Sequence, residues 1–448
     1  MNSDNQFVGV LLAGGRGERA KPLTLAGPTY LRSKALIPFL GRPLIEWTVE
    51  QIHEQGADDF YVVAHGLENR LQISSLLGAG DRHGVSVRYS RTRLDRYNTG
   101  SGAATLHNIE AWDLTGDALV LPVDSVVDLD VAAMRRRHRE SGAVVTVAVV
   151  ERPAAEVAGK YGTMSADADG LVSEFLEKPT REVADRLARE REDQGLGSAL
   201  PTSAGLYLVD CAALRDVVRR AGLVRRGTGT LDWGGDLLPW LVGVGCPVVT
   251  HPIGEMGDLG SVPDFLLSAI GALDGRFPHV TRALGPSLDG ASAVWIDPTS
   301  LALPDPRTGL TLAEKIVTGM VEIGPGVRIG RHVEIGPGVR LDHADLGDGV
   351  DVAEGATVSR AVCADGAIVG PHAVVTDSYL GPLVTVGSSR RRPARLQAFT
   401  ALGDGAAVPP GIRLSQVTVY PGLRIPREAR VPAGSRLASA QEVLDLAG

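Results

Sequence analysis

Over residues 318–437 the chain repeats an aliphatic residue at about every sixth position. The repeat is clearest in IGPGVRIGRHVEIGPGVRL, which starts at Ile323, and Gly, Pro or Asp fills many of the positions between. An α-helix cannot repeat at six, and a strand with one buried face repeats at two. The period therefore predicts a β-solenoid in which each flat face turns one aliphatic side chain inward. The inward positions that we expect are Ile323, Ile329, Ile335, Leu341, Leu346, Val352, Val358, Val362, Ile368, Val374, Leu380, Val386, Leu402, Val408, Leu414, Val419, Ile425, Val431 and Leu437.

The period slips in phase and is interrupted once. The interruption is GSSRRRPARLQAFTA at 387–401, which we expect to be a loop outside the coil. Its arginines are typical of a solvated loop tip, and an effector or partner site is the alternative. The last residues, 438–448, are expected to form a tail with a short capping helix.

Residues 1–274 alternate between strand-like and helix-like patterns. We expect strands at 8–12, 59–64, 118–122 and 143–150, and helices at 43–55, 68–78, 100–112 and 130–140. This alternation predicts a parallel sheet with crossover helices, whose ligands bind beyond the carboxyl ends of the strands. The loop at 13–21 and the acidic stretch at 124–130 both follow such strands. Residues 275–317 lose the rhythm, contain five prolines and are expected to be a linker.

The composition bounds the class of protein. The chain has 448 residues, 44% of them hydrophobic, and a formal net charge of −8, which indicates a globular protein of two or three domains without a nucleic-acid footprint. Its three cysteines show no C-x-x-C spacing, so neither a zinc site nor a disulfide framework is indicated. The start, MNSDNQF, lacks a basic region, and no apolar run reaches the ~18 residues of a membrane span. We expect a cytoplasmic protein.

The segment VGVLLAGGRGERAKPLT, residues 8–24, contains a formal match to the G-x-G-x-x-A dinucleotide fingerprint. That fingerprint needs a helix that opens at its last small residue, but here Pro22 follows, so a dehydrogenase is rejected. Backbone amides of a glycine loop can bind an anion, and Arg is suited to phosphate. The basic residues around the loop are Arg16, Arg19, Lys21, Arg32 and Lys34. They favour a polyphosphate site over a simple tight strand exit.

Four further segments could carry chemistry. YNTGSGAA at 97–104 is either a turn on which a planar base lies or an ordinary capped helix start. Asp124 directly follows a buried strand, where a carboxylate is costly unless it is paired or binds a metal. Glu177 and Lys178 end an apolar strand after YGTM (161–164), and alone they would be a surface ion pair. Asp258 lies between glycines just before a helix, and alone it would be a turn residue.

In this order the segments resemble the sugar-1-phosphate nucleotidylyltransferases, the nucleoside-diphosphate-sugar pyrophosphorylases. That family's pattern is L-x-A-G-G-x-G-T-R-L-x-P-L-T, then P-K-x-L-x-P, a G-T-A-G-A-like turn, a metal-binding Asp, E-K-P and a late D-x-G. The resemblance covers about residues 7–274. Members with a C-terminal left-handed hexapeptide β-helix, such as the ADP-glucose and GDP-mannose pyrophosphorylases, are similar over the whole chain.

The resemblance implies an α/β fold: a mixed, mostly parallel, Rossmann-like (GT-A-like) nucleotidyltransferase domain at 1–274, a linker at 275–317 and a left-handed parallel β-helix at 318–437. It implies transfer of the NMP of an NTP to a sugar or cyclitol 1-phosphate, with Mg²⁺, and release of pyrophosphate. The serine in PTSAGLYLVD and the stretch DWGGDLLP lean towards adenylyl transfer, whereas KYGTM and GSVPDFL resemble the guanylyl branch equally. The base and the sugar stay open, with a hexose 1-phosphate expected.

The resemblance also implies roles for individual residues. The catalytic residues would be Arg19, Lys34 and Lys178. The nucleotide would be bound by Leu12, Ala13, Gly14, Gly15, Gly17, Arg19, Gly100, Ser101 and Asp124. The sugar phosphate would be bound by Tyr161, Gly162, Glu177, Lys178, Ser203 and Gly205. The magnesium ligands would be Asp124 and Asp258.

The chain departs from the family pattern in places. Glu18 stands where the family has Thr, which puts an acid into the phosphate loop, and Ala20 replaces Leu. Ser33 replaces the Pro before Lys34, and an extra stretch, AGPTYLRS, precedes that lysine. The late motif reads MGD and lacks its aromatic residue. These departures leave the core chemistry in place and point to an unusual choice of nucleotide or sugar.

Two other functions compete with this one. A bifunctional uridylyl/acetyltransferase is disfavoured by the KPLT that follows the glycine loop and by the short solenoid. A non-catalytic regulatory or scaffold subunit of the same fold is disfavoured because Arg19, Lys34, Asp124, Lys178 and Asp258 are all retained. An uncovered solenoid end favours association, so we expect a homo-oligomer held together by the β-helix.

Overall fold

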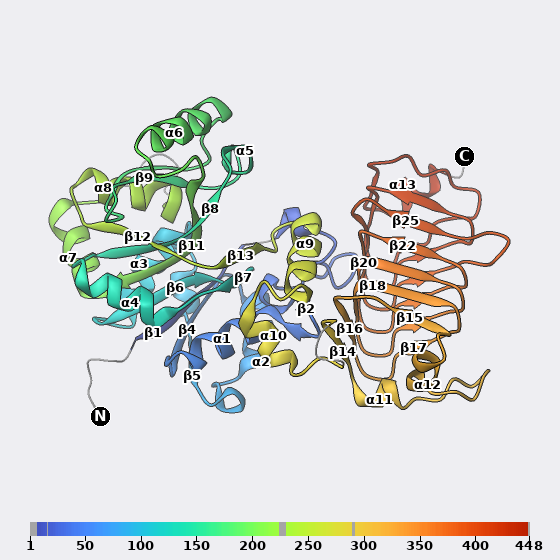
Figure 1. Ribbon diagram of the computed structural model, residues 1–448. Helices are drawn as coiled ribbons and strands as arrows, with labels where there is room; N and C mark the ends of the chain where they lie inside the picture. The colour runs from blue at the N-terminus through green and yellow to red at the C-terminus, as the bar shows by residue number, and fades with distance from the viewer. Residues whose placement is uncertain (1–6, 16, 224–229, 289–291, 447–448) are drawn as a thin grey trace. The chain divides into compact units, whose positions relative to one another are not determined.

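The computed structural model describes residues 7–15, 17–223, 230–288 and 292–446 (Figure 1). The chain forms two compact units. The first joins Met1–Gly15 to Ile45–Met256, and the second joins Arg16–Leu44 to Gly257–Gly448. The segment that follows the first strand therefore packs with the C-terminal part of the chain.

The first unit is built on a mixed sheet of nine described strands. The strands are β1 (Val8–Ala13), β4 (Asp59–Ala64), β5 (Ser86–Tyr89), β6 (Asp117–Pro122), β8 (Val145–Arg152), β9 (Thr163–Ala166), β10 (Val172–Leu176), β11 (Leu200–Asp210) and β12 (Val248–Pro252). Along most of the sheet the order is β10-β9-β11-β6-β1-β4-β5, and β8 pairs with β11 and β12. The strands β6, β1, β4 and β5 are parallel, whereas β11 runs antiparallel to β6, β8 and β9. The expected mixed, mostly parallel sheet is confirmed.

Helices alternate with these strands as the hydrophobic pattern predicts. The helices are α1 (Leu44–Glu54), α2 (Leu67–Leu77), α3 (Ser101–Ala111), α4 (Val131–Glu140), α5 (Ala154–Val157), α6 (Arg181–Asp193), α7 (Cys211–Ala221) and α8 (Leu238–Gly243). Two short strands, β7 (Ser125–Asp128) and β13 (Glu255–Asp258), lie outside the large sheet. Side chains fix where several helices begin: Asp130 accepts a 2.8 Å hydrogen bond from the N–H of Ala133, and Asp210 caps α7 in the same way.

The strand register sets where the loops of the first unit emerge. Leu12 of β1 lies opposite Pro122 of β6, and both strands end within one residue of this pair. The N–H of Val123 also donates to the carbonyl of Leu12 at 3.4 Å. The glycine loop and Asp124 therefore leave the sheet at the same edge, as expected for carboxyl ends of parallel strands.

The second unit contains a parallel β-helix of short strands. These are β14 (Val294–Ile296), β15 (Val321–Ile323), β16 (Val327–Ile329), β17 (Glu334–Ile335), β18 (Val339–Leu346), β19 (Asp351–Val352), β20 (Thr357–Cys363), β21 (Ile368–Val369), β22 (Val374–Thr376), β23 (Ser378–Leu380), β24 (Thr385–Val386), β25 (Arg395–Gln397), β26 (Thr400–Leu402), β27 (Ala407–Val408), β28 (Arg413–Ser415), β29 (Thr418–Val419) and β30 (Arg436–Leu437). Their pairing is parallel from coil to coil. The six-residue period thus identified the architecture correctly.

The register also shows why the period slips. Val352 pairs with Val369, and Val369 pairs with Val386, so one coil is seventeen residues long. A coil of seventeen has two sides of six residues and one of five, which shifts the inward position by one residue in each turn. The expectation that Val362, Ile368 and Val374 point inward was therefore wrong by one residue. Ile368 is 43% exposed, and the fully buried residues are Cys363, Val369 and Val375.

The predicted loop at 387–401 is shorter than expected. Strand β25 and the start of β26 lie within it, and β25 pairs with β22 and β28. The coil that contains this segment is longer than the others, because Leu380 pairs with Leu402, twenty-two residues on. Only the residues before Arg395, including the arginines at 390–392, leave the regular coil.

The stretch 275–317 contains regular structure. Its elements are α10 (Pro278–Leu284), β14, α11 (Pro298–Leu301) and α12 (Leu312–Val317), and β14 pairs with β16 of the β-helix. Before it, α9 (Val262–Leu273) packs on β18 and β20. At the other end, α13 (Ala440–Leu444) places Val443 in the β-helix core, as expected of a capping helix.

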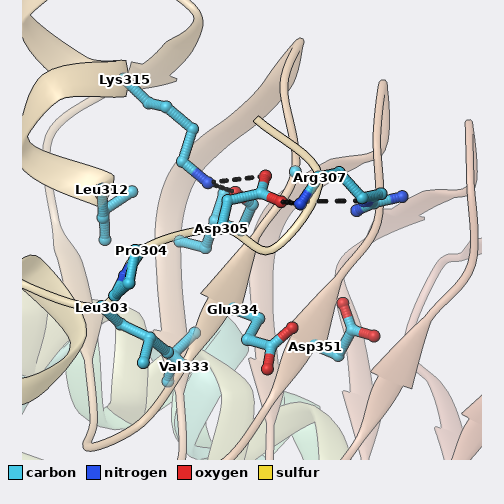
Figure 2. Close-up of a pocket in the computed structure, with 11 residues that line it drawn as sticks. Leu303, Pro304, Asp305, Arg307, Leu312, Lys315, Val333, Glu334 and Asp351 are labelled. Carbon is cyan, nitrogen blue, oxygen red and sulfur yellow. Dashed lines mark hydrogen bonds and ion pairs between the residues drawn. The ribbon is translucent and has the colours of Figure 1, made fainter. Parts of the chain in front are cut away.

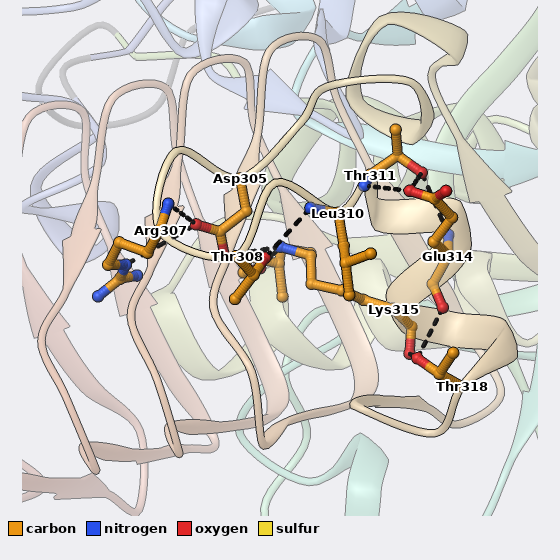
Figure 3. A network of polar contacts seen from close by, with 9 residues as sticks. Asp305, Arg307, Thr308, Leu310, Thr311, Glu314, Lys315 and Thr318 are labelled. Carbon is orange, nitrogen blue, oxygen red and sulfur yellow. Dashed lines mark hydrogen bonds and ion pairs between the residues drawn. The ribbon is translucent and has the colours of Figure 1, made fainter.

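Polar contacts fix α12 at the first coils (Figure 3). Thr311 and Glu314 form a capping box, in which the Thr311 hydroxyl accepts from the Glu314 N–H and the Glu314 carboxylate accepts from the Thr311 N–H. Lys315 extends from the same helix to Asp305. None of the helices in the described part of the chain combines the length and apolarity that a membrane crossing requires.

Candidate functional site

The first part of the predicted nucleotide loop follows β1 in the first unit. Gly14 and Gly15 are exposed, and a Cβ placed on either would meet no atom within 4 Å. Gly15 has φ 93°, which L-residues with a side chain rarely adopt. Below them, Asn69 Nδ2 donates a 2.6 Å hydrogen bond to the carbonyl of Ala13. The backbone of this loop is therefore held at its base and open above, as an anion-binding loop requires.

Asp124 lies two residues after β6, at the same edge of the sheet as this loop. Its side chain is half-buried. The two other acids of the stretch have structural contacts. Asp130 caps α4, as expected, and the carbonyl of Asp128 accepts from the N–H of Gly254 at 3.0 Å.

The turn that opens α3 is capped by a residue far along the chain. The N–H and the hydroxyl of Ser101 donate to Asp232 Oδ1 at 3.0 and 3.2 Å, and the N–H of Ala103 donates to the carbonyl of Leu231. A Cβ on Gly100 would lie 2.5 Å from that carbonyl oxygen, so this position requires glycine. The capped-helix alternative accounts for these contacts, and a nucleotide contact at Gly100 and Ser101 stays a prediction.

The predicted sugar-phosphate residues lie together at the end of β10. Lys178 adopts φ 48°, the left-handed region that is costly for a residue with a side chain. Its N–H donates to the carbonyl of Tyr161 at 3.2 Å, and its Nζ lies 3.3 Å from Glu177 Oε1. The N–H of Ser203 donates to the carbonyl of Gly162 at 2.9 Å. Three separate stretches of sequence thus meet in one place.

Two glycines make room for the Glu177 carboxylate. A Cβ on Gly162 would lie 2.7 Å from Glu177 Oε2, and a Cβ on Gly234 would lie 2.3 Å from it. Beside them, the N–H of Gly205 donates to the Ser203 hydroxyl at 3.2 Å, where Gly205 has φ 69° in an irregular part of β11. The missing side chains at Gly162 and Gly234 therefore let the Glu177 carboxylate lie against the backbone of both residues.

Sequence reasoning did not place Asp232, Trp233 or Gly234 in this region. Trp233 stacks on Tyr207 with ring centroids 4.3 Å apart and planes at 20°, and its Nε1 donates to Thr105 Oγ1. Burial raises the pKa of Tyr207, so this phenol stays protonated. The sequence signal for these residues was the stretch DWGGDLLP. Two adjacent glycines beside a Trp are unusual in an exposed helix, and here Trp233 is buried and Gly234 makes room for Glu177.

The remaining predicted residues belong to the second unit. Gly17 has φ 63°, its carbonyl accepts from Thr24 Oγ1 at 2.9 Å, and a Cβ on it would lie 3.2 Å from Lys34 Cγ. Lys34 begins a short 3₁₀ helix, Lys34–Leu36, that Ser33 caps through the N–H of Ala35. The second half of the glycine loop thus packs directly on the lysine that the family pattern makes catalytic.

Arg19 and Asp258 also meet in this unit. A Cβ on Gly260 would lie 2.9 Å from Asp258 Oδ1 and 3.4 Å from Arg19 Nη2, so both side chains border the same glycine. The N–H of Gly260 donates to Asp258 Oδ1 at 2.8 Å, and the Ser268 hydroxyl donates to the Asp258 carbonyl. A cation and a carboxylate are therefore fixed side by side.

The acid in the phosphate loop has a basic partner. Glu18 Oε2 lies 2.7 Å from Lys21 Nζ, so its charge is offset within the loop. Arg16, which sequence reasoning counted among the loop cations, lies outside the described residues.

The residues expected to hold magnesium are a carboxylate in each unit, Asp124 and Asp258. In the described part of the chain no three His, Cys, Asp or Glu side chains group as a metal site. Proteins bind magnesium through one or two carboxylates together with substrate phosphates and water. The donor set is therefore compatible with the expected ion.

A separate pocket lies beside the first coils of the β-helix, where Glu334 and Asp351 carboxylates approach the loop that carries Asp305 (Figure 2). Its cavity volume is about 10 Å³. That is room for about one water molecule. The pocket is too small for a nucleotide or a sugar.

Comparison with known proteins agrees with the geometry. The family model described as "Nucleotidyl transferase" matches residues 8–226. The UTP–glucose-1-phosphate uridylyltransferase of Synechocystis sp. is 28% identical over 381 residues, which are 83% of this chain and 86% of that protein. The glucose-1-phosphate adenylyltransferases of Rhodococcus erythropolis and Rhodococcus opacus are each 30% identical over 253 residues, 55% of this chain. The match spans 59% of the length of these two proteins.

The family match covers the glycine loop, Asp124, the Glu177–Lys178 pair and Ser203. The relatives are named as nucleotidyltransferases that act on glucose 1-phosphate, which is the reaction class that the resemblance implies. Residues 8–226 belong to the nucleotidyl transferase family, and the distant homologues of the chain are sugar-1-phosphate nucleotidyltransferases.

Proposed function

We propose that the protein transfers the NMP of a nucleoside triphosphate to a sugar or cyclitol 1-phosphate. An oxygen of the sugar phosphate attacks the α-phosphorus, the bond from that phosphorus to the bridging oxygen breaks, and pyrophosphate leaves. Because the attack is direct, no covalent enzyme intermediate is needed. Catalysis then consists of positioning and of neutralising charge on two polyanions.

The observation that carries this proposal is the group of residues at the end of β10. Lys178 offers a point charge that suits a phosphate, and Glu177 offers acceptors for sugar hydroxyls. Gly162 and Gly234 leave room for that carboxylate, since a Cβ on them would lie 2.7 and 2.3 Å from Glu177 Oε2. We assign the sugar phosphate to these residues together with Tyr161, Ser203 and Gly205.

We assign the triphosphate to the glycine loop and its cations. The backbone of residues 12–15 and Gly17 would donate to phosphate oxygens, Arg19 would add forked donors, and Lys34 would bridge phosphates. Gly100 and Ser101 would lie beside the base. Arg19, Lys34 and Lys178 are thus the proposed catalytic residues.

Asp124 and Asp258 are the proposed ligands of Mg²⁺. When bound, the ion would neutralise charge on the α-phosphate. The N–H of Gly260 donates to Asp258 Oδ1 at 2.8 Å and so orients this carboxylate.

For the substrates, the sequence favours adenylyl or guanylyl transfer to a hexose 1-phosphate. The relatives are named as uridylyl and adenylyl transferases that act on glucose 1-phosphate, which supports a hexose 1-phosphate as the acceptor. They also add UTP to the nucleoside triphosphates to be tested. We also propose four functional divisions of the chain: the catalytic domain at 1–274, the linker at 275–317, the β-helix at 318–437 and the tail at 438–448.

Association through the β-helix and a cytoplasmic location also belong to the proposal. Ile368 and Leu383 are apolar side chains of the β-helix that are 43% and 69% exposed. Apolar surface of this kind favours contact between copies. The cysteines Cys211, Cys246 and Cys363 are buried free thiols, which suits a reducing compartment.

The test is pyrophosphate release by the purified full-length protein with Mg²⁺. ATP, GTP, UTP, CTP and dTTP are each combined with glucose 1-phosphate, mannose 1-phosphate and a cyclitol phosphate. We expect turnover with one preferred pair that depends on both substrates. A folded protein that releases no pyrophosphate with any pair would support the non-catalytic subunit instead.

A further inference from the structure

The segment that carries Lys34 is tied to the β-helix by an ion pair with little exposure to solvent. Arg32 Nη2 donates to Asp404 Oδ2, and the two side chains are 13% and 17% exposed. The other amino group, Nη1, donates to the carbonyl of Leu23 at 2.9 Å. One guanidinium thus joins a β-helix carboxylate to the backbone of the phosphate-binding segment.

Arg32 lies in the extra stretch that separates this chain from the family pattern. The stretch folds back on itself: Leu25 and Leu31 form an antiparallel bridge, and the N–H of Arg32 donates to the carbonyl of Thr24 at 2.9 Å. Thr24 in turn holds Gly17 through its hydroxyl. Lys34 follows Arg32 by two residues and packs on the same glycine. Fixing Arg32 therefore fixes both Gly17 and Lys34.

The partner of Arg32 is itself rigid. Asp404 lies between β26 and β27, and its carbonyl accepts from the N–H of Gly422 on the next coil at 2.8 Å. Burial raises the pKa of Asp404, so its carboxylate depends on the guanidinium to stay charged. A buried ion pair of this kind is costly to break from one side, because the other charge is left without compensation.

A second tie lies on the other side of Lys34. The ring of Phe39 meets Phe265 of α9 edge to face at 6.1 Å, and Phe265 meets Tyr379 of the β-helix in the same way at 5.7 Å. Residues 33–38 are thus held at both ends. The Arg32 tie is polar and this one is aromatic, so a substitution that keeps the shape of Asp404 can remove the first and leave the second.

We infer that Arg32 is a positioning residue, which uses Asp404 of the β-helix to hold Lys34 and Gly17 in the arrangement that binds the triphosphate. This inference rests on the proposed function. It gives the β-helix a part in catalysis, since one of its coils would order the phosphate-binding segment.

The test compares Asp404→Asn and Arg32→Lys with the full-length wild type. The matched control is Asp348→Asn, which makes the same change in an ion pair with Arg331 whose side chains are 35% and 64% exposed on the β-helix. Pyrophosphate release and amide hydrogen exchange are measured for each protein. Far-UV circular dichroism and gel filtration show that each variant is folded.

In Asp404→Asn we expect kcat/KM for the triphosphate to fall by about 10²-fold, the scale typical of a misplaced catalytic group. The affinity for the sugar phosphate should stay within about twofold, because the residues assigned to it lie in the other unit. Arg32→Lys keeps the charge but loses the fork, so its loss should be smaller. In a double variant the two losses should not add. A purely stabilising pair would not separate the two substrates in this way.

Hydrogen exchange tests the inference without any substrate. Amides of residues 17–36 should exchange at least about tenfold faster in Asp404→Asn than in the wild type, while those of β18 and β20 stay unchanged. Exchange and kinetics that match Asp348→Asn would overturn the inference. A wild type without pyrophosphate release would overturn the proposed function instead, and the exchange rates would still decide on Arg32. If Asp404→Asn does not fold, Arg32→Lys decides by the same measurements.

Discussion

Lys315 Nζ lies 3.1 Å from Asp305 Oδ2, and the two side chains are 2% and 5% exposed. The ammonium also donates to the carbonyl of Ile335 in β17 (Figure 2). Burial opposes ionisation of Asp305, but the N–H of Arg307 and the Lys315 ammonium lower its pKa below the usual range. The pair therefore holds α12 and the loop at 303–310 to the first coils of the β-helix.

We expect Asp305→Asn to lower the free energy of unfolding by about 3–5 kcal/mol, because it leaves the Lys315 charge buried without a counter-charge. Chemical denaturation measures this loss. Asp348→Asn, in an exposed pair, should cost at most about 1 kcal/mol. Joint replacement, Asp305→Asn with Lys315→Met, should recover most of the loss. A single variant as stable as the wild type would contradict the assigned role.

The contribution of Asp305 should depend on pH in a defined direction. Its pKa is lowered in the folded protein, so the stabilisation is fully present above the unfolded pKa of about 3.9. It is lost as the pH falls through the folded value. The difference in unfolding free energy between wild type and Asp305→Asn should therefore be constant above about pH 5 and shrink below about pH 4. A difference that grows on acidification would contradict the lowered pKa.

Gly234→Ala should weaken sugar-phosphate binding. The new Cβ would lie 2.3 Å from Glu177 Oε2, so this carboxylate has to move. The adjacent Gly235→Ala is a matched control, since its Cβ would meet no atom within 4 Å. We expect KM for the sugar 1-phosphate to rise about tenfold in Gly234→Ala only, the effect of losing one hydrogen-bonding group at a binding site. Equal KM values for the two variants would show that Glu177 does not take part in binding the sugar 1-phosphate.

Asp124→Asn and Asp258→Asn should each remove most activity while the fold is kept. Each change removes a charge that is assigned to magnesium, where a positioned electrostatic group is worth about 10²-fold or more in rate. Turnover is measured at saturating Mg²⁺. Asp130→Asn is the control, because Asn caps a helix as well as Asp does. Near-normal turnover in either of the first two variants would show that the metal assignment is wrong.

Lys178→Ala should raise KM for the sugar phosphate and lower kcat, while triphosphate affinity stays nearly unchanged. Its charge would meet the sugar's phosphate in the ground state and the attacking oxygen in the transition state. Arg181→Ala removes a nearby cation that is paired with Asp185 on the exposed face of α6, and it should have no such effect. If calorimetry instead shows a loss of triphosphate affinity, Lys178 belongs to the other substrate.

Light scattering at micromolar concentration should give the intact chain the mass of an oligomer, at least twice the 47 kDa of one chain. Leu383→Asp places a charge at an exposed apolar position of the β-helix and should lower this mass. Leu71→Asp alters a residue of similar exposure on α2 and should leave it unchanged. A clean monomer in the wild type would refute association through the β-helix.

Both architectures and the family could be predicted from the amino-acid sequence. A face that is buried shows as a periodic pattern of hydrophobic residues in the sequence. This period is six in the β-helix, and before it the strand and helix patterns alternate. The strands at 8–12, 59–64 and 118–122 appear where the pattern predicts them. Motifs of a few residues, such as the glycine loop and Glu177–Lys178, were also readable because they are contiguous.

Which distant residues meet could not be predicted from the sequence. Asp232 caps the turn at Ser101, and Asp404 holds Arg32 from 372 positions away along the chain. The one-residue shift from Ile368 to Val369 was decided by the five-residue side of each coil. Local periodicity records whether a residue is buried, but it does not record which partner buries it, because that partner is chosen by the packing of the whole chain.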